Sequence, residues 1–195
     1  MLKQAITSGD LGDVLVLQIT ALKGQPTSNW RDDTRLAGGG ALFEGGIHWM
    51  SLLANIGLTP GRVRAALPRS PELHGTLCGE RSVVVTIEYA EGAVATLAYS
   101  WDLPSLVNGV RLSHVYGTRG TLRFETNGLF ALQTGRRPRP IFPGLADLAG
   151  YRAMMTDFIA AIDLNRPPQY TLALARRDLQ LIEDAYASIN GSHSS

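Results

Sequence analysis

The alternation of apolar and polar residues predicts helices at both ends of the chain and strands between them. Residues 2–8 are typical of a helix end, which Gly9 terminates. Residues 14–22 follow as a strand, because leucine and isoleucine recur there with a period of two. Residues 41–56 predict a helix, since their large apolar side chains fall at helical spacing.

The middle of the sequence is typical of consecutive β-hairpins. Strands are predicted over residues 82–89, 92–101, 110–116, 121–125 and 129–133. Two short connections support the pattern, Ala90-Glu91 and Thr126-Asn127-Gly128, and the second contains the Asn-Gly pair that favours tight hairpins. Consecutive hairpins build an antiparallel sheet, and we expect the strand at 14–22 to add a parallel pairing.

The final third predicts two helices, separated by the helix-breaking run NRPP at 165–168. Apolar stripes mark the two helices: Tyr151, Met154, Phe158, Ile159 and Ile162, then Leu172, Ala175, Leu179, Ile182, Tyr186 and Ile189. This order of elements predicts an α+β fold, an open, mostly antiparallel mixed sheet with helices packed on one face. We expect a single domain over residues 1–195, with a disordered tail at 191–195.

The strand at 92–101 has apolar or small residues on both of its faces. A sheet that is covered by helices on one side only normally exposes polar residues on the other. We therefore expect the second face of the sheet to be buried as well, in a homo-oligomer.

The composition excludes some classes of protein but does not identify a functional site. Of 195 residues, 45% are hydrophobic and 18% are charged, and the net charge is +1, which argues against a nucleic-acid partner. No signal peptide or membrane helix is evident, and the single cysteine, Cys78, suits a reducing compartment. We expect a soluble cytoplasmic protein that does not associate with membranes.

Residues 38–50 (GGGALFEGGIHWM) carry the strongest candidate for chemistry. Five glycines in nine positions imply that another part of the protein, or a ligand, comes close to this backbone. On a helix, Glu44 and His48 project from the same face, one turn apart. A histidine beside a carboxylate is a general acid/base with its tuning group, so both are candidate catalytic residues.

The simpler interpretation of this spacing is a surface pair, or a core histidine held by protein partners. Two ligands four residues apart, without a third at recognisable spacing, do not predict a metal site. Trp30 and Arg31 precede the glycine run and are placed to supply an aromatic wall and a cation near the histidine. Together with Gly39 and Gly40, they are the candidate substrate-binding residues.

These residues resemble the C-terminal domain of the Gfo/Idh/MocA oxidoreductases, the family of glucose-fructose oxidoreductase and inositol dehydrogenase. Residues 2–19 are similar to the family's helix end, glycine turn and first strand. Residues 30–53 (WRDDTRLAGGGALFEGGIHWMSLL) match its W-R, G-G-G and D-x-G-x-H-x-x-D/S-L-L signature. Residues 116–124 and 158–192 are similar to its late hairpin strand and its last two helices.

The resemblance implies a role for each matched residue. His48 falls on the family's catalytic histidine, which exchanges a proton with the substrate hydroxyl while hydride passes to or from a nicotinamide. Glu44 falls where the family usually has an aspartate, and Arg31 falls on an arginine near the substrate. Members normally begin with a Rossmann domain whose lysine acts in catalysis, and neither Lys3 nor Lys23 matches that lysine.

The glycine run has no preceding strand and does not fit a dinucleotide fingerprint, so no cofactor-binding residue is predicted. NAD or NADP is expected only with a Rossmann domain, on a separate chain or on a longer gene product. Three functions remain open: half of a sugar or polyol dehydrogenase, a non-catalytic binding or scaffold module, and a cofactor-independent acid/base enzyme. An open cleft beside His48 favours the first, a fully bonded ring the second, and a closed pocket including Arg31 or Tyr116 the third.

Overall fold

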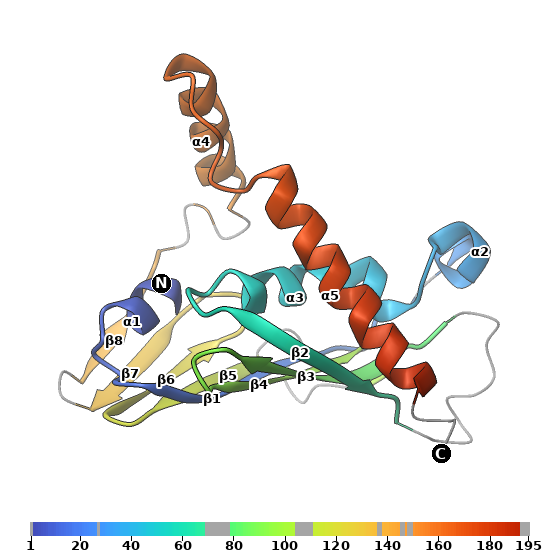
Figure 1. Ribbon diagram of the computed structural model, residues 1–195, viewed down its shortest axis with the longest axis horizontal. Coiled ribbons are helices and arrows are strands. Elements are labelled where there is room, and N and C mark those ends of the chain that lie inside the picture. Colours follow the sequence, from blue (N-terminus) through green and yellow to red (C-terminus); the bar gives the residue numbers. More distant parts are fainter. Residues whose placement is uncertain are drawn as a thin grey trace.

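A computed structural model of the chain describes residues 2–26, 28–68, 79–103, 111–135, 138–144, 147 and 150–191. Cys78 and residues 192–195 of the predicted tail lie outside the described residues. The body of the protein is one twisted eight-stranded sheet with helices on one side (Figure 1). The predicted α+β class is confirmed.

The strands occur in the spatial order β2-β3-β4-β1-β5-β6-β7-β8. They are β1 (Val14–Leu22), β2 (Pro60–Ala66), β3 (Ser82–Tyr89), β4 (Val94–Ser100), β5 (Leu112–Gly117), β6 (Gly120–Glu125), β7 (Ala131–Gly135) and β8 (Arg139–Ile141). The α-helices are α1 (Leu2–Thr7), α2 (Thr34–Ala37), α3 (Ile47–Ala54), α4 (Tyr151–Asp163) and α5 (Leu172–Gly191). A 3-10 turn spans Asn29–Asp32 and a π-helical turn spans Leu42–Gly46.

The first strand joins two antiparallel halves of the sheet. β1 pairs parallel with β4 and antiparallel with β5, and the other neighbouring strands pair antiparallel. The predicted parallel pairing is therefore confirmed. The hairpin at Asn127-Gly128 is also present, with Gly128 at a φ of 90°, a value that glycine adopts readily.

The core lies between the sheet and the helices α1, α3 and α5. Leu97 of β4 is fully buried, and so are Ile87 of β3 and Leu17 of β1, which are the inward-facing residues of their strands. Met50 and Leu53 of α3 close the core from the helical side and are also fully buried. Alternation along each strand therefore selects the covered face, as the period of two predicts.

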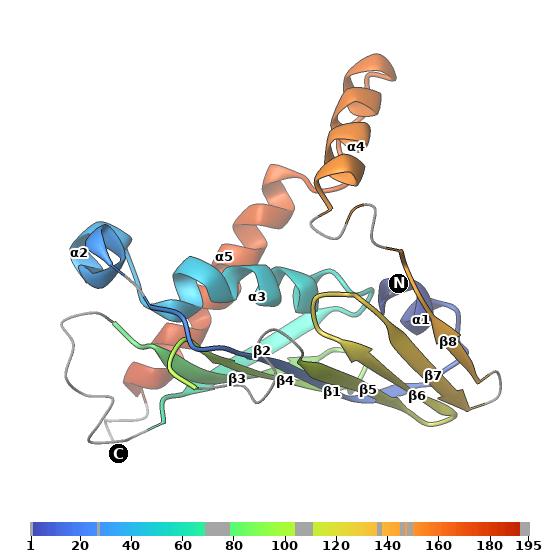
Figure 2. The same ribbon diagram turned by 180° about the vertical axis from the view of Figure 1, so that it is seen from behind.

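The opposite face of the sheet carries no helix (Figure 2). Along β4, Val94, Thr96 and Ala98 point to this open face and are only partly buried. Thr96 lies between Thr86 of β3 and Gln18 of β1, near the middle of the sheet. On β4 this open face is therefore formed by small and β-branched side chains.

The helix α4 departs from the prediction that the helices pack on the sheet. It stands away from the sheet in both ribbon views, and its apolar stripe, Tyr151, Met154, Phe158, Ile159 and Ile162, is 53–69% exposed. The C-terminal half of α5 does pack, with Ile182 1% exposed. Asn165, at a φ of 47°, lies in the connection between the two helices.

Two strands were not predicted by the hydrophobic pattern. β2 contains only one large apolar residue, Val63, which is also its only buried residue. Arg139 and Pro140, in the basic and proline-rich run at 135–140 (GRRPRP), belong to the second strand, β8, which pairs with β7. Both strands lie at an edge of the sheet, where proline and arginine are tolerated because one side of the strand has no partner.

Candidate functional site

The candidate helix begins differently from the sequence prediction. A single α-helix was expected from residue 41, but the first turn, Leu42–Gly46, is π-helical and α3 begins at Ile47. Glu80, just before β3, holds this start: its carbonyl accepts the Ala41 N–H at 2.7 Å and its carboxyl group accepts the Leu42 N–H at 2.8 Å. Glu80 therefore caps the helix from a distant part of the sequence.

Close approach of protein groups explains the glycines. A Cβ at Gly40 would collide with the carboxyl group and the carbonyl of Glu80, and a Cβ at Gly45 would collide with the Tyr99 hydroxyl. A Cβ at Gly39 would lie 2.7 Å from the Cβ of Phe43. The segment is thus shaped to fit the sheet and its cap, and the substrate-binding role of Gly39 and Gly40 stays a prediction.

The cap also makes a prediction about pH. Burial raises the pKa of the Glu80 carboxyl group above its ordinary value of 4.5, although hydrogen bonds from Leu42 and Tyr186 oppose the shift. The folded state then binds more protons than the unfolded state, so this contribution to stability is full below about pH 4.5 and is lost as pH rises through the raised pKa. We expect Glu80→Gln to remove this part of the pH dependence in urea unfolding at a series of pH values. Identical pH profiles for the two proteins would contradict this role of Glu80.

The predicted catalytic residues line one hollow of about 320 Å³. Its lining residues are Lys23, Gln25, Glu44, Gly45, His48, Trp49, Tyr99, Arg111 and Asn127. They come from the end of β1, the π-turn, α3, β4 and the segments that flank β5 and β6. His48 is exposed and forms no hydrogen bond with any described residue, so its ring is not held by those residues.

Glu44 has a different partner from the one expected. Its carboxylate forms an ion pair with Arg31 at 2.7 Å, and the structure describes no hydrogen bond between Glu44 and His48. The Arg31 guanidinium also lies over the Trp30 ring, 4.9 Å from its centroid. Trp30 thus contacts Arg31, Arg31 binds Glu44, and His48 lines the same hollow as Glu44 without a hydrogen bond to the described residues. The expectation that Glu44 orients His48 is not met among the described contacts.

Seven lining residues were not predicted as site residues: Lys23, Gln25, Gly45, Trp49, Tyr99, Arg111 and Asn127. Lys23 directly follows β1 and Arg111 directly precedes β5, and these two strands are antiparallel neighbours. The end of one strand and the start of the next therefore meet at the same edge of the site. This adjacency follows from strand pairing, which the spacing of residues in the sequence does not reveal.

Tyr99 forms the floor between the helix and the sheet. Its hydroxyl accepts a hydrogen bond of 2.9 Å from the Trp101 indole N–H. Burial raises the pKa of the Tyr99 hydroxyl, and the negative charge of Glu44 raises it further. Tyr99 is therefore a protonated, fixed group in the floor of the hollow.

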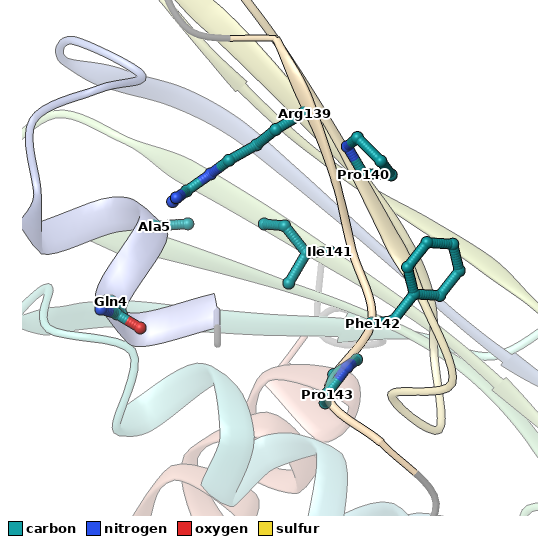
Figure 3. Close-up of a pocket in the computed structure, with 7 residues that line it drawn as sticks. All are labelled: Gln4, Ala5, Arg139, Pro140, Ile141, Phe142 and Pro143. Atoms are coloured by element: carbon teal, nitrogen blue, oxygen red, sulfur yellow. The ribbon is translucent and has the colours of Figure 1, made fainter.

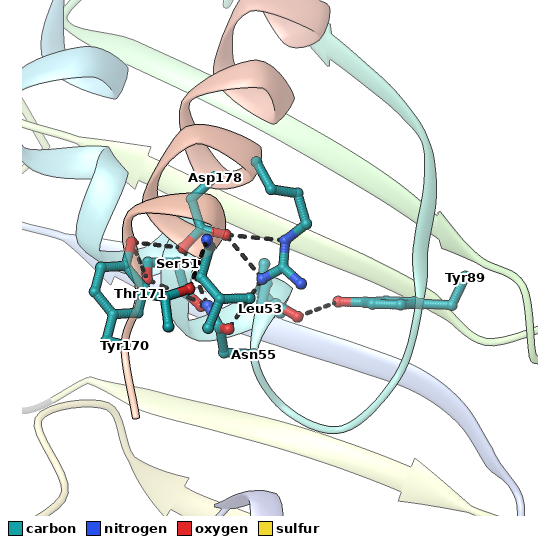
Figure 4. A network of polar contacts seen from close by, with 9 residues as sticks. Ser51, Leu53, Asn55, Tyr89, Tyr170, Thr171 and Asp178 are labelled. Carbon is teal, nitrogen blue, oxygen red and sulfur yellow. Dashed lines mark hydrogen bonds and ion pairs between the residues drawn. The ribbon is translucent and has the colours of Figure 1, made fainter. Parts of the chain in front are cut away.

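Two other polar features lie apart from these residues. A second hollow, of about 480 Å³, is lined by Gln4, Ala5 and residues 139–143 between α1 and β8, and contains none of the predicted site residues (Figure 3). Asp178 of α5 is fully buried and accepts hydrogen bonds from Asn55, Tyr170 and Arg177, which join α5 to the end of α3 (Figure 4). This network fixes the helix that carries His48 but does not reach the hollow.

In the described part of the chain, no group of three histidine, cysteine, aspartate or glutamate side chains is arranged to hold a metal ion. None of the helices described is both long enough and apolar enough to cross a membrane. Among the hollows formed by the described residues, the one beside His48 gathers the predicted residues.

Comparison with solved structures shows the same fold in several oxidoreductases. The aldose-aldose oxidoreductase from Caulobacter crescentus, complexed with glycerol, has a TM-score of 0.83 at 19% identity and is matched by 98% of this chain. An NAD binding oxidoreductase from Klebsiella pneumoniae gives 0.82 at 17% identity over 98% of this chain, and levoglucosan dehydrogenase, complexed with NADH and levoglucosan, gives 0.80 at 19% over 97%. The chain spans 58%, 61% and 60% of the lengths of these three proteins.

A comparison with family models assigns the chain more directly. The GFO/IDH/MocA C-terminal domain model matches residues 1–123, which include β1, the glycine run and His48. No curated protein matches the chain. By this match, which covers more than half of the sequence, the chain belongs to the GFO/IDH/MocA family, in the C-terminal domain that characterises it.

Proposed function

We propose that this chain is the substrate-binding half of an NAD(P)-dependent oxidoreductase that acts on the CH–OH groups of sugars or polyols. The observation that carries the proposal is His48, exposed at a polar hollow and without a hydrogen bond to the described residues. An imidazole in such a position is able to exchange a proton with a bound hydroxyl group. Tyr99, Gln25 and Asn127 supply neutral hydrogen-bonding groups that suit a polyhydroxy ligand.

The solved relatives support the same class of ligand. The Caulobacter crescentus enzyme is complexed with glycerol, and levoglucosan dehydrogenase is complexed with NADH and levoglucosan. Glycerol and levoglucosan are small polyhydroxy compounds, whose size agrees with a hollow of about 320 Å³. These relatives do not identify the substrate of this chain.

The dinucleotide does not fit the glycine-rich helix start of this chain. Phosphate groups bind where a strand turns into a helix and the first backbone N–H groups are free. Here the Glu80 carboxyl group already accepts the Leu42 N–H, and no strand precedes the glycine run directly. We assign the nicotinamide to a nucleotide-binding unit outside residues 1–195, on the same polypeptide or on another chain.

The exposed stripe of α4 supports such a unit. Phe158 and Ile162 are 53% and 64% exposed, which is unusual for large apolar side chains on one helical face. The solved relatives are longer by a part that this chain does not match. We propose that α4 packs against that additional part in the complete enzyme.

The geometry favours this proposal over a cofactor-independent enzyme. Tyr116 lies on the open face of the sheet, where its ring stacks on His114 at 5.6 Å, and it does not line the hollow. Arg31 is held by Glu44. The convergence of Arg31 or Tyr116 on His48, which the acid/base alternative requires, is therefore not among the described contacts.

The replacement of His48 by glutamine tests the proposed role. In a fusion of this chain to the nucleotide-binding portion of the Caulobacter crescentus relative, we expect His48→Gln to lower kcat by about 10²–10⁴-fold, because the proton acceptor is lost. The matched control is His114→Gln, on the open face. A fusion whose rate of sugar oxidation is unchanged by His48→Gln would contradict the proposal. If the fusion is inactive, imidazole NMR of the chain itself decides: polyols must shift the His48 signal and not that of His114.

We further propose that the open face of the sheet forms a homo-oligomer. Thr96→Arg places a long charged side chain at the middle of this face, so we expect it to convert a dimer or larger species into a monomer in sedimentation experiments. Gln180→Arg, on the exposed side of α5, is the control and should leave the oligomer intact. A monomeric wild-type chain at high concentration would contradict this proposal.

A further inference from the structure

Two cations line the hollow beside His48. Lys23 follows the last residue of β1 and Arg111 precedes the first residue of β5. Because β1 and β5 are adjacent and antiparallel, both residues arrive at the same end of the sheet. The backbone around them is tied together, since the Thr20 N–H donates to Ser113 and the Thr126 hydroxyl donates to the carbonyls of Thr20 and Arg111.

Neither cation is neutralised by a described carboxylate. The Lys23 ammonium group has no described hydrogen bond or ion pair. The Arg111 guanidinium donates one described hydrogen bond, of 2.8 Å, to the neutral amide oxygen of Asn127, and it lies 5.8 Å from the centroid of the Trp49 ring. Its Nε is buried and has no hydrogen-bond partner among the described residues.

The carboxylates nearby are already engaged. Glu44 lines the same hollow but is paired with Arg31 at 2.7 Å. Glu125 is fully buried at the end of β6. Its carboxylate accepts hydrogen bonds from the backbone N–H groups of Asn127, Leu129 and Arg111. Because Arg31 balances the charge of Glu44, the unpaired charges in the wall of the hollow are those of Lys23 and Arg111.

This arrangement is unfavourable without an anion. Lys23 is partly buried, and both its burial and the charge of Arg111 lower the pKa of its ammonium group, whereas Glu44 raises it. A partly desolvated cation without an ion-pair partner loses hydration that the more distant charge of Glu44 replaces only in part. An anion between Lys23 and Arg111 would restore that interaction. The planar guanidinium is especially suited to a carboxylate.

We propose that the hollow takes a sugar acid or a similar polyhydroxy acid, with its carboxylate between Lys23 and Arg111 and a hydroxyl group toward His48. This inference rests on the proposed function and specifies its substrate class. A volume of about 320 Å³ lies at the small end of ligand cavities and suits a six-carbon acid better than a nucleotide-linked sugar. The preference comes from the wall of the hollow and does not require the nucleotide-binding unit.

The test compares D-gluconate with D-sorbitol, which has the same carbon skeleton and a hydroxyl group in place of the carboxylate. Binding to the 195-residue chain is followed by tryptophan fluorescence and by calorimetry, since Trp49 lines the hollow. Glucose 6-phosphate and inorganic phosphate are titrated in parallel, to separate a carboxylate site from a phosphate site. We expect gluconate to bind about tenfold or more tightly than sorbitol, with a preference that weakens as salt is added.

Variants assign the preference to the two cations. Lys23→Gln and Arg111→Gln should each reduce the gluconate-to-sorbitol ratio toward one, and Lys3→Gln should not, because Lys3 is the other lysine of the chain and lies on α1. A reduced ratio in Arg111→Gln could also result from disruption of the local fold, because Arg111 bonds to Asn127. The result for Lys23→Gln therefore decides whether the inference holds. A wild-type-like ratio in Lys23→Gln would overturn the inference.

The outcomes separate this inference from the proposed function. If sorbitol binds as tightly as gluconate, the acid preference is wrong and the sugar or polyol site stands. If glucose 6-phosphate or inorganic phosphate binds better than gluconate, the site recognises phosphate and the inference is wrong. If none of the polyhydroxy compounds binds, the proposed function fails together with the inference.

Discussion

Replacement of Leu97 by alanine is expected to lower the free energy of unfolding by about 2–5 kcal/mol. Leu97 is fully buried in β4, between Ile19 of β1 and Val85 of β3. Its truncation removes apolar contacts at the point where the parallel pairing joins the two halves of the sheet. The cavity that remains cannot close without moving strands on both sides. Chemical denaturation at constant pH measures the loss.

Leu132 provides the matched control for this prediction. It is also a strand leucine, in β7, but it lies on the open face and is 46% exposed. Leu132→Ala should change the free energy of unfolding by about 0.5 kcal/mol or less in the monomer. Equal losses for the two variants would show that the covered face of the sheet is not the core.

The second large effect is expected at Glu125. Glu125→Ala should lower the free energy of unfolding by about 2–4 kcal/mol, because it leaves several partly buried backbone N–H groups without acceptors. These N–H groups belong to Asn127 and Leu129, with a longer contact to Arg111 at 3.4 Å. Since Asn127 and Arg111 line the hollow, ligand binding should weaken as well.

Glutamine at position 125 tests whether the loss of acceptor oxygens causes the loss of stability. Its side chain keeps one acceptor oxygen, so Glu125→Gln should lose less stability than Glu125→Ala. A stability of the alanine variant equal to that of the wild type would contradict the assignment of Glu125 as the group that holds this turn. Thermal and urea unfolding of the three proteins are the measurements.

The strands of the sheet were predictable where strand-like runs flank a short connection. The runs at 82–89 and 92–101, on either side of Ala90-Glu91, predicted β3 and β4, and the Asn127-Gly128 pair predicted the hairpin between β6 and β7. β2 was missed because an edge strand needs few apolar residues to be stable. The apolar residues of α4 predicted the helix correctly, but not that it lies away from the sheet. An apolar stripe shows that one face of a helix is apolar, and does not show which part of the protein packs against that face.

The site was predictable only in part. The spacing of Glu44 and His48 placed both at one hollow, as the sequence indicated. The ion pair of Glu44 with Arg31 was not predicted, because it joins residues 13 positions apart, on either side of α2 and the first three glycines. Lys23 and Arg111 were missed for the same physical reason: strand pairing brings them together across a long stretch of sequence.

The glycines illustrate how one pattern supports two explanations. Close approach to the backbone was predicted correctly from their number, and a ligand was one of the candidates. In the structure Gly40 accommodates Glu80 and Gly45 accommodates Tyr99. The hollow for the ligand lies beside this turn, with Gly45 in its wall. The glycines therefore position the segment that carries His48, whichever ligand binds.

Calorimetric titration of the 195-residue chain with NADH at millimolar concentration tests the central claim most directly. That claim is that residues 1–195 form the substrate-binding half of an oxidoreductase, whose nicotinamide is held by a different unit. We expect no binding of NADH to the chain alone, because Glu80 occupies the glycine-rich helix start where a phosphate would bind. Binding of NADH with micromolar affinity would contradict this claim and would require a complete dinucleotide site within this domain.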